Sequence, residues 1–260
     1  MNIPIVMTAF GTRGPARATY DHLDGHLRAA FPGHPLHWAY SSRMVRHLNR
    51  RSGAAPVPGP QEVLGELAAR GHRWAVLQST HLLCGHEFHR LLTATRKAPL
   101  RISIGLPLLT DPVDFDALAR ILADIATATA PETATVFVGH GTDHPTWMAY
   151  PLLQGLLRQI GARHAHIGVL EGRPGIADVL SALSGTGVRK VRLFPLLLVA
   201  GNHFHQDLIG TDPESWQSRL QSAGLAVEAV DQGIGLLPRV ADLFCRHVRE
   251  ALDVIPSSRE

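Results

Sequence analysis

The sequence predicts an α/β protein made of two similar lobes, each a parallel sheet flanked by helices. Short apolar runs alternate with longer amphipathic stretches along the whole chain, a pattern typical of parallel strands connected by helices. Four short segments also recur in the same order in the second half of the chain, which indicates an internal duplication. We therefore expect an N-terminal lobe over residues 1–129 and a C-terminal lobe over residues 130–260, with a hinge at 130–132.

Eight apolar runs are the expected strands, and they divide equally between the lobes. Helical segments fill the gaps, and two of them, residues 60–70 and 112–126, begin with a proline that suits a first helical turn. A flavodoxin-like strand order of 2-1-3-4 would make the first three strands of each lobe neighbours. The strands are expected at residues 4–9, 36–40, 74–78, 102–105, 135–138, 166–170, 191–199 and 226–230.

The repeat is clearest where a strand runs into a glycine. VMTAFGT at 6–12 corresponds to VFVGHGT at 136–142, an offset of 130 residues. Two further pairs keep this offset: WAYSS with GVLEG, and one Ile-Gly-Leu segment with another. The fourth pair, CGHEFH and AGNHFH, is separated by 116 residues. A longer connection near residues 50–60 of the first half accounts for the difference.

The composition excludes several classes of protein. Hydrophobic residues make up 45% and charged residues 18%, which is ordinary for a compact domain and unlike a disordered chain. No apolar run approaches the ~18 residues that cross a bilayer, and the first residues lack the basic start of a signal peptide, so we expect a cytoplasmic protein without a membrane partner. A net charge of +3 without a dense basic run argues against nucleic acid as a partner.

Three side chains of the second lobe stand at or just past the ends of its first three strands: His140, Glu171 and His203. Ligands of open parallel sheets bind outside the carboxyl ends of the strands. Adjacent strands lie ~4.8 Å apart, so these side chains can converge on one ion if the strands are neighbours. Two imidazoles and a carboxylate suit a borderline divalent ion and leave coordination positions open for exchange. The repeat places Phe10, Ser41 and Glu87 at the corresponding positions of the first lobe.

Each of the three also has a plainer interpretation. The glycines beside His140 can serve a tight turn, Glu171 precedes a helix start that favours an acid, and His203 can support a neighbouring ligand instead of binding the ion. Other histidine pairs have metal-compatible spacing but weaker support. They are His140 with His144, His86 with His89, and His164 with His166.

Several longer segments resemble one known family over essentially the whole chain. They are AFGTR, AYSSRM, QSTHLLCGHEF, IGLPLL, VFVGHGTDH, GVLEGRP and FPLLLVAGNH. These segments are similar to the ATP-independent cobalt chelatases of anaerobic cobalamin synthesis, which act on sirohydrochlorin and belong to the class II chelatases. The resemblance implies a chelatase-like fold of two lobes with a tetrapyrrole cleft between them. It also implies cobalt(II) as the substrate metal, held by His140, Glu171 and His203, and no nucleotide.

The resemblance also implies how the residues share the reaction. His140 would accept a pyrrole proton, and Glu87 of the first lobe would take or relay the other. Many relatives have an acidic residue before Glu87, whereas this chain has His86, a departure from the family's pattern in the first lobe. Arg46 is a further candidate for the substrate's carboxylates. The residues expected to bind the tetrapyrrole are Phe10, Gly11, Thr12, Arg13, Ser41, Ser42, Arg43, His81, Gly85, Gly201 and Asn202.

Other functions remain open at this point. The same fold can serve an iron or nickel chelatase for a related tetrapyrrole, since imidazole and carboxylate accept all three metals. A non-catalytic tetrapyrrole or metal carrier is a second class. A zinc hydrolase using His140, His144, His203 and His205 is a third and weaker one. The sequence is also compatible with a homo-oligomer.

Overall fold

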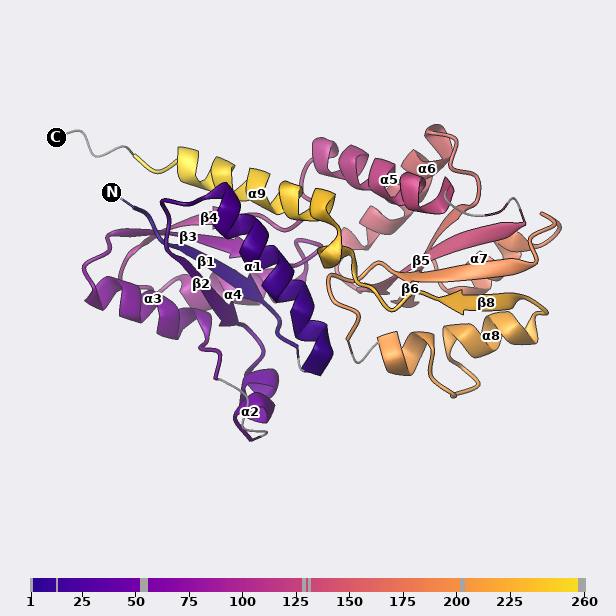
Figure 1. The fold of residues 1–260 in the computed structure, drawn as a ribbon, viewed down its shortest axis with the longest axis horizontal. Helices are drawn as coiled ribbons and strands as arrows, with labels where there is room; N and C mark the ends of the chain where they lie inside the picture. Colours follow the sequence, from indigo (N-terminus) through magenta and orange to yellow (C-terminus); the bar gives the residue numbers. More distant parts are fainter. Residues whose placement is uncertain are drawn as a thin grey trace. The chain divides into compact units, whose positions relative to one another are not determined.

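The computed structural model describes residues 2–12, 14–51, 56–127, 130, 132–201 and 204–256. The chain forms two compact units, one of Met1–Thr110 with Gly235–Glu260 and the other of Asp111–Ile234. Each unit contains a four-stranded parallel sheet with helices on both faces (Figure 1). The predicted fold class is therefore confirmed.

The first unit is built on a sheet with the strand order β2-β1-β3-β4. The central strand β1 has five buried side chains because helices cover both of its faces. Helices α3 and α4 pack on the face that carries Val6 and Leu77, while α9 packs on α1 and against β3 and β4 (Figure 1). The elements are β1 (Ile5–Ala9), η1 (Gly14–Arg17), α1 (Ala18–Ala30), β2 (Leu36–Tyr40), α2 (Arg43–Arg51), α3 (Pro60–Ala69), β3 (Trp74–Ser79), α4 (His86–Thr95), β4 (Arg101–Gly105) and α9 (Pro238–Asp253).

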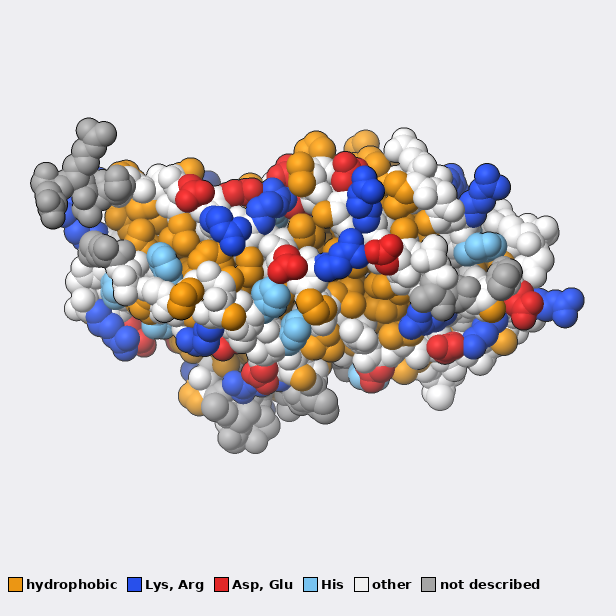
Figure 2. All heavy atoms as spheres, turned by 45° about the horizontal axis from the view of Figure 1, so that its top comes forward, with side chains coloured by type: hydrophobic (Ala, Val, Ile, Leu, Met, Phe, Trp, Pro, Cys, Tyr) orange, Lys and Arg blue, Asp and Glu red, His pale blue; other side chains and the backbone are white. Residues whose placement is uncertain are grey.

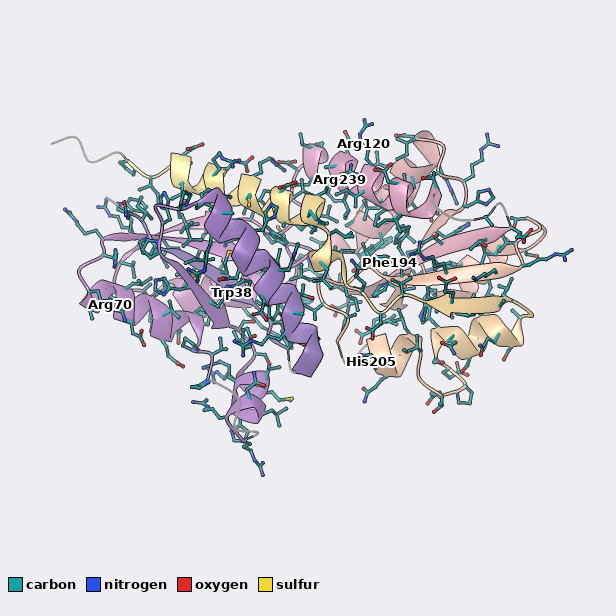
Figure 3. The ribbon with its side chains drawn as sticks, in the orientation of Figure 1. Trp38, Arg70, Arg120, Phe194, His205 and Arg239 are labelled. Carbon is teal, nitrogen blue, oxygen red and sulfur yellow. The ribbon has the colours of Figure 1, made fainter. Side chains whose placement is uncertain are left out.

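The second unit repeats this order as β6-β5-β7-β8. Helices α7 and α8 pack on the face that carries Val136 and Val191, and α5 and α6 pack on the other side. The ring centroids of Phe137 on β5 and Phe194 on β7 lie 5.5 Å apart, and this contact joins the two strands in the core. Phe194 is labelled in Figure 3. The elements are α5 (Pro112–Thr127), β5 (Thr133–Gly141), η2 (Pro145–Met148), α6 (Ala149–Gln159), β6 (Ala165–Glu171), α7 (Ile176–Leu183), β7 (Lys190–Pro195), η3 (Phe204–Leu208), α8 (Trp216–Ser222), β8 (Ala226–Ala229) and η4 (Ile234–Leu236).

The matching strand orders confirm that β6, β5 and β7 are neighbours, as the 2-1-3-4 arrangement requires. The register pairs β5 with β6 from Thr135 opposite Ala165 to Gly141 opposite Glu171. Strand β5 therefore runs three residues beyond the predicted end at 138, which places His140 inside the strand rather than after it. Strand β7 ends at Pro195, earlier than the predicted 199.

The compact units differ from the two halves of the repeat. Helix α5 follows the first sheet in sequence but packs against α6, β5 and β6, while α9 follows the second sheet and packs against α1, β3 and β4. The expected lobes 1–129 and 130–260 follow the repeat, whereas packing divides the chain after Thr110 and again before Gly235. Both helices have an apolar stripe that needs a sheet face, and their sequences do not specify which sheet covers it.

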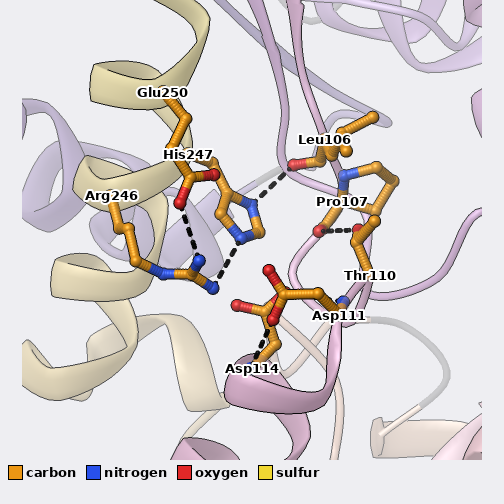
Figure 4. Close-up of polar contacts among 8 residues, drawn as sticks. All are labelled: Leu106, Pro107, Thr110, Asp111, Asp114, Arg246, His247 and Glu250. Carbon is orange, nitrogen blue, oxygen red and sulfur yellow. Dashed lines mark hydrogen bonds and ion pairs between the residues drawn. The ribbon is translucent and has the colours of Figure 1, made fainter.

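Polar contacts fix α9 on its unit. The buried His247 donates through Nδ1 to the carbonyl of Leu106 at 3.0 Å, and its Nε2 accepts from Arg246 at 3.3 Å (Figure 4). Arg246 also pairs with Glu250 at 2.7 Å. Ser103 on β4 donates to the carbonyl of Ala251 at 2.6 Å. The bonds of Leu106 and Ser103 attach α9 to the strand-end loop and edge strand of the first sheet, while those of Arg246 lie within the helix.

The surface carries charges of both signs. On the face drawn in Figure 2, basic and acidic side chains are interspersed rather than separated by sign. None of the helices in the described part of the chain combines the length and the apolar character needed to span a membrane.

Candidate metal and tetrapyrrole site

Two of the three expected metal ligands lie at the carboxyl edge of the second sheet. His140 is half-buried near the end of β5, and Glu171 is exposed at the end of β6. The two strands are hydrogen-bonded neighbours, and Glu171 is opposite Gly141, the residue after His140. His140 Nδ1 lies 3.4 Å from the carbonyl oxygen of Gly141. The structure thus brings this imidazole and this carboxylate to adjacent strand ends.

The third expected ligand, His203, lies outside the described residues, as do Asn202 and Arg13. Gly201 is the last described residue of the loop after β7. Among the residues that the structure does describe, no group of three or more His, Cys, Asp or Glu side chains is arranged to hold an ion. The His140, Glu171 and His203 set therefore stays a prediction, supported by the positions of its first two members.

A glycine is required on each side of His140. Gly141 has φ +87°, and a Cβ there would lie 1.8 Å from the carbonyl oxygen of Glu171. A Cβ on Gly139 would lie 2.5 Å from the ring of Tyr150. The Gly-His-Gly motif thus lets β5 approach β6 on one side and α6 on the other. These glycines are thus needed for the close packing of β5, a requirement separate from the tight turn expected of them.

Tyr150, at the start of α6, is a residue that the sequence reasoning missed. Its hydroxyl accepts a hydrogen bond from the backbone N–H of Gly141 at 3.2 Å. Burial raises the pKa of Tyr150 above its ordinary value, so the phenol stays neutral. In the first unit the buried Tyr20 lies near the backbone of Gly11, which partly offsets the rise that burial causes in its pKa. Tyr20 and Tyr150 are 130 residues apart, so the repeat contained the signal.

The first unit brings together the expected tetrapyrrole-binding residues of the β1 and β2 ends. The N–H of Ser41 donates to Ala9 at 2.8 Å, and the N–H of Ser42 donates to Phe10 at 3.1 Å. The Ser42 hydroxyl accepts from Val45 at 3.3 Å and so begins α2. The Ser41 hydroxyl is buried and has no partner among the described residues. The ring of Phe10 is 47% exposed, so this edge offers an apolar surface beside polar groups.

The remaining expected residues of this unit surround the end of β3. Gly85 is the N-cap of α4, and Glu87 lies in its first turn, where it pairs with Arg90. His81 Nδ1 lies 2.8 Å from the Ser79 hydroxyl, while its Nε2 is buried without a partner among the described residues. Burial lowers the pKa of His81 to about 4, and the nearby Glu87 carboxylate offsets only part of this effect. His81 is therefore a neutral imidazole at physiological pH.

The low pKa of His81 predicts a pH-dependent loss of stability. The unfolded chain protonates this ring near pH 6.5 and the folded chain only near pH 4, so the unfolded state binds more protons between these values. The stabilisation is fully present above pH 6.5 and is lost as the pH falls towards 4. We expect wild type to lose up to about 2 kcal/mol more unfolding free energy than His81→Gln between pH 7 and pH 5. Urea unfolding at both pH values measures this difference, with the exposed His164→Gln as the control. Equal losses in all three proteins would contradict the burial of His81.

The chain is similar to a family of known proteins over nearly its whole length. The family model described as cobalt chelatase (CbiK) matches residues 4–253. Sirohydrochlorin cobaltochelatase CbiKC of Nitratidesulfovibrio vulgaris is 33% identical over 260 residues, covering 96% of this chain and 91% of that protein. The sirohydrochlorin cobaltochelatase of Salmonella typhimurium is 31% identical over 234 residues, covering 88% of this chain and 87% of that protein.

Solved structures show the same fold. SirB from Bacillus subtilis with Fe³⁺ superposes with a TM-score of 0.65 at 18% identity, covering 96% of each chain. The sirohydrochlorin chelatase SirB from Bacillus subtilis subspecies spizizenii, in complex with cobalt, gives 0.60 at 16% identity and covers 97% of this chain and 96% of that chain. The chain belongs to the cobalt chelatase (CbiK) family and is a metal chelatase. The resemblance seen in the sequence is confirmed.

Proposed function

We propose that this protein inserts cobalt(II) into sirohydrochlorin, without ATP, as a step of anaerobic cobalamin synthesis. One observation of the chain itself carries the proposal: His140 and Glu171 stand at the ends of adjacent strands in the second unit. Two relatives named for this reaction, each more than 30% identical over most of the chain, support the choice of metal and tetrapyrrole.

In the proposed reaction His140, Glu171 and His203 hold the substrate ion. Two imidazoles and a carboxylate bind a divalent ion of this kind and leave positions open for the four ring nitrogens. Glu171 is exposed and its carboxylate makes no hydrogen bond or ion pair within the described part of the chain, so the carboxylate oxygens are available for an ion. An open site suits an ion that must be passed on rather than kept.

Insertion also requires the removal of two pyrrole N–H protons. His140 accepts one of them, because a neutral imidazole nitrogen can act as a general base. A bound divalent ion opposes protonation of the same ring, so His140 serves as ligand and base in turn rather than together. Glu87 of the first unit takes or relays the other proton. No nucleotide takes part in this scheme.

The strand ends of the first unit bind the tetrapyrrole in this proposal. Sirohydrochlorin is a polycarboxylate, and backbone N–H groups, hydroxyls and arginines are its natural partners. Helix α2, directly after Ser42, carries four arginines and no acid in nine residues. Of these, Arg46 is engaged with Glu62 at 2.8 Å, while Arg43 is exposed and pairs with no residue of the described chain. Among the arginines of α2, Arg43 lies nearest the end of β2, and it can bind a substrate carboxylate.

Reversing the charge of Arg43 is expected to weaken substrate binding. Arg43→Glu should raise the KM for sirohydrochlorin by about tenfold at low salt and leave kcat nearly unchanged, because a charge-assisted bond to a carboxylate is lost. The difference should shrink in ~0.5 M NaCl, which screens exposed charges. Steady-state kinetics at two salt concentrations measure this, and Arg120→Glu on α5 makes the same charge change at another exposed site (Figure 3). An equal rise in both variants would point to net charge rather than to Arg43.

The function is tested by an anaerobic assay that follows sirohydrochlorin absorbance with cobalt(II), iron(II) and nickel(II) in turn, without ATP. Insertion of cobalt with the highest kcat/KM supports the proposal. A preference for iron or nickel would keep the chelatase and change its metal. Binding of tetrapyrrole with no acceleration of insertion would identify a carrier, and no binding or insertion with any metal would sink the proposal.

A further inference from the structure

The ring and hydroxyl of Tyr150 both contact the segment that carries His140. The hydroxyl accepts the N–H of Gly141 at 3.2 Å, and the ring fills the space that a side chain at position 139 would occupy. Tyr150 is 3% exposed and lies at the start of α6, so its own position is fixed by the core. We infer that Tyr150 is a positioning residue of the metal site, a role that rests on the proposed function of His140 and Glu171.

The same bond also fixes the strand that carries Glu171. Gly141 is the register partner of Glu171, and its backbone is so close to β6 that an added Cβ would lie 1.8 Å from the Glu171 carbonyl oxygen. A hydrogen bond that holds the Gly141 peptide therefore sets the separation of the two strand ends. That separation decides whether His140 and Glu171 can bind one ion, because ligand geometry must be held within a few tenths of an ångström.

A comparison of the two repeats distinguishes a positioning role of Tyr150 from a purely structural one. In the first unit, Tyr20 is 6% exposed and lies near the backbone of Gly11, but the position of His140 is occupied there by Phe10. The tyrosine–glycine pair thus exists once beside a proposed ligand and once beside none. A role in the fold alone predicts similar effects for the two tyrosines, whereas a positioning role predicts that only Tyr150 affects metal binding.

The test compares Tyr150→Phe with Tyr20→Phe. Each change removes one hydroxyl and keeps the ring. Cobalt(II) is titrated into each apo-protein anaerobically, without tetrapyrrole, and the dissociation constant is read from the visible absorption of the bound ion. We expect Tyr150→Phe to weaken cobalt binding by about tenfold, in line with residues that orient metal ligands, and Tyr20→Phe to bind within twofold of wild type. Thermal unfolding of both variants shows whether their losses of stability are alike.

Two results would overturn the inference. One is a cobalt dissociation constant of Tyr150→Phe within twofold of wild type, and the other is an equal weakening in both variants. The insertion assay is separate from this titration. Wild type that binds cobalt through His140 but never inserts it would refute the proposed function and leave the role of Tyr150 intact. If wild type inserts cobalt but Tyr150→Phe binds cobalt as wild type does, the proposed function stands and the role of Tyr150 is refuted.

Discussion

Replacement of His140 by alanine is expected to lower the kcat/KM for cobalt insertion by at least about 1000-fold. The change removes a proposed metal ligand and the proposed base together, and positioned general bases alone contribute about 100-fold to 10,000-fold. His140 sits between two glycines that are packed against Tyr150 and β6, so neither of its sequence neighbours carries a side chain that could replace it. The variant should still fold, because the ring of His140 is only half-buried and lies near the carboxyl end of β5.

The measurement is the anaerobic insertion assay, accompanied by a cobalt titration without tetrapyrrole. His164→Ala is the matched control, since His164 is an exposed histidine of the same unit that precedes β6 at the opposite edge of the sheet. Its kcat/KM should stay within twofold of wild type. Full activity in His140→Ala would remove His140 from the mechanism even if the insertion reaction itself were established.

Gly141→Ala is expected to destabilise the protein by about 3 kcal/mol or more. The added Cβ would lie 1.8 Å from the carbonyl oxygen of Glu171, and φ is +87°, where residues with a side chain are strained. Since the obstruction is backbone in a hydrogen-bonded neighbouring strand, relief requires β5 and β6 to separate. We therefore also expect cobalt binding to be lost under conditions in which the variant is folded.

Urea unfolding followed by circular dichroism measures this effect. Gly155 in α6 provides the control, because a Cβ there would meet no atom within 4 Å. Gly155→Ala should stabilise the protein by about 0.5–1 kcal/mol through helix propensity. A loss of less than about 1 kcal/mol in Gly141→Ala would mean that the two strand ends are not in close contact.

The sequence predicted the strands well because burial on both faces makes them nearly continuous apolar runs. Residues 36–40 match β2 without error, and the assumed order of the strands is confirmed in both sheets. Periodicity could not show that α5 and α9 exchange units. It identifies the apolar stripe of a helix, and either repeated sheet could have covered the stripe of either helix.

The site was predictable to the extent that it depends on strand ends. His140 and Glu171 could be placed next to each other from the repeat and the expected strand order. Tyr150 was missed because its hydroxyl binds a backbone N–H, which leaves no complementary side chain in the sequence, and only its match to Tyr20 across the repeat signalled it. The buried state of His81 was missed as well, although its hydroxyl partner Ser79 lies only two residues away.

The exchange of α5 and α9 has a consequence for synthesis on the ribosome. Residues 111–234 are contiguous, so the second unit can finish folding as soon as they emerge. The first unit is translated earlier, yet one face of its sheet has to wait for α9, whose last residue is Asp253. The first sheet is thus made before the second and completed after it, and until α9 has emerged its uncovered apolar strands are a natural target for chaperones.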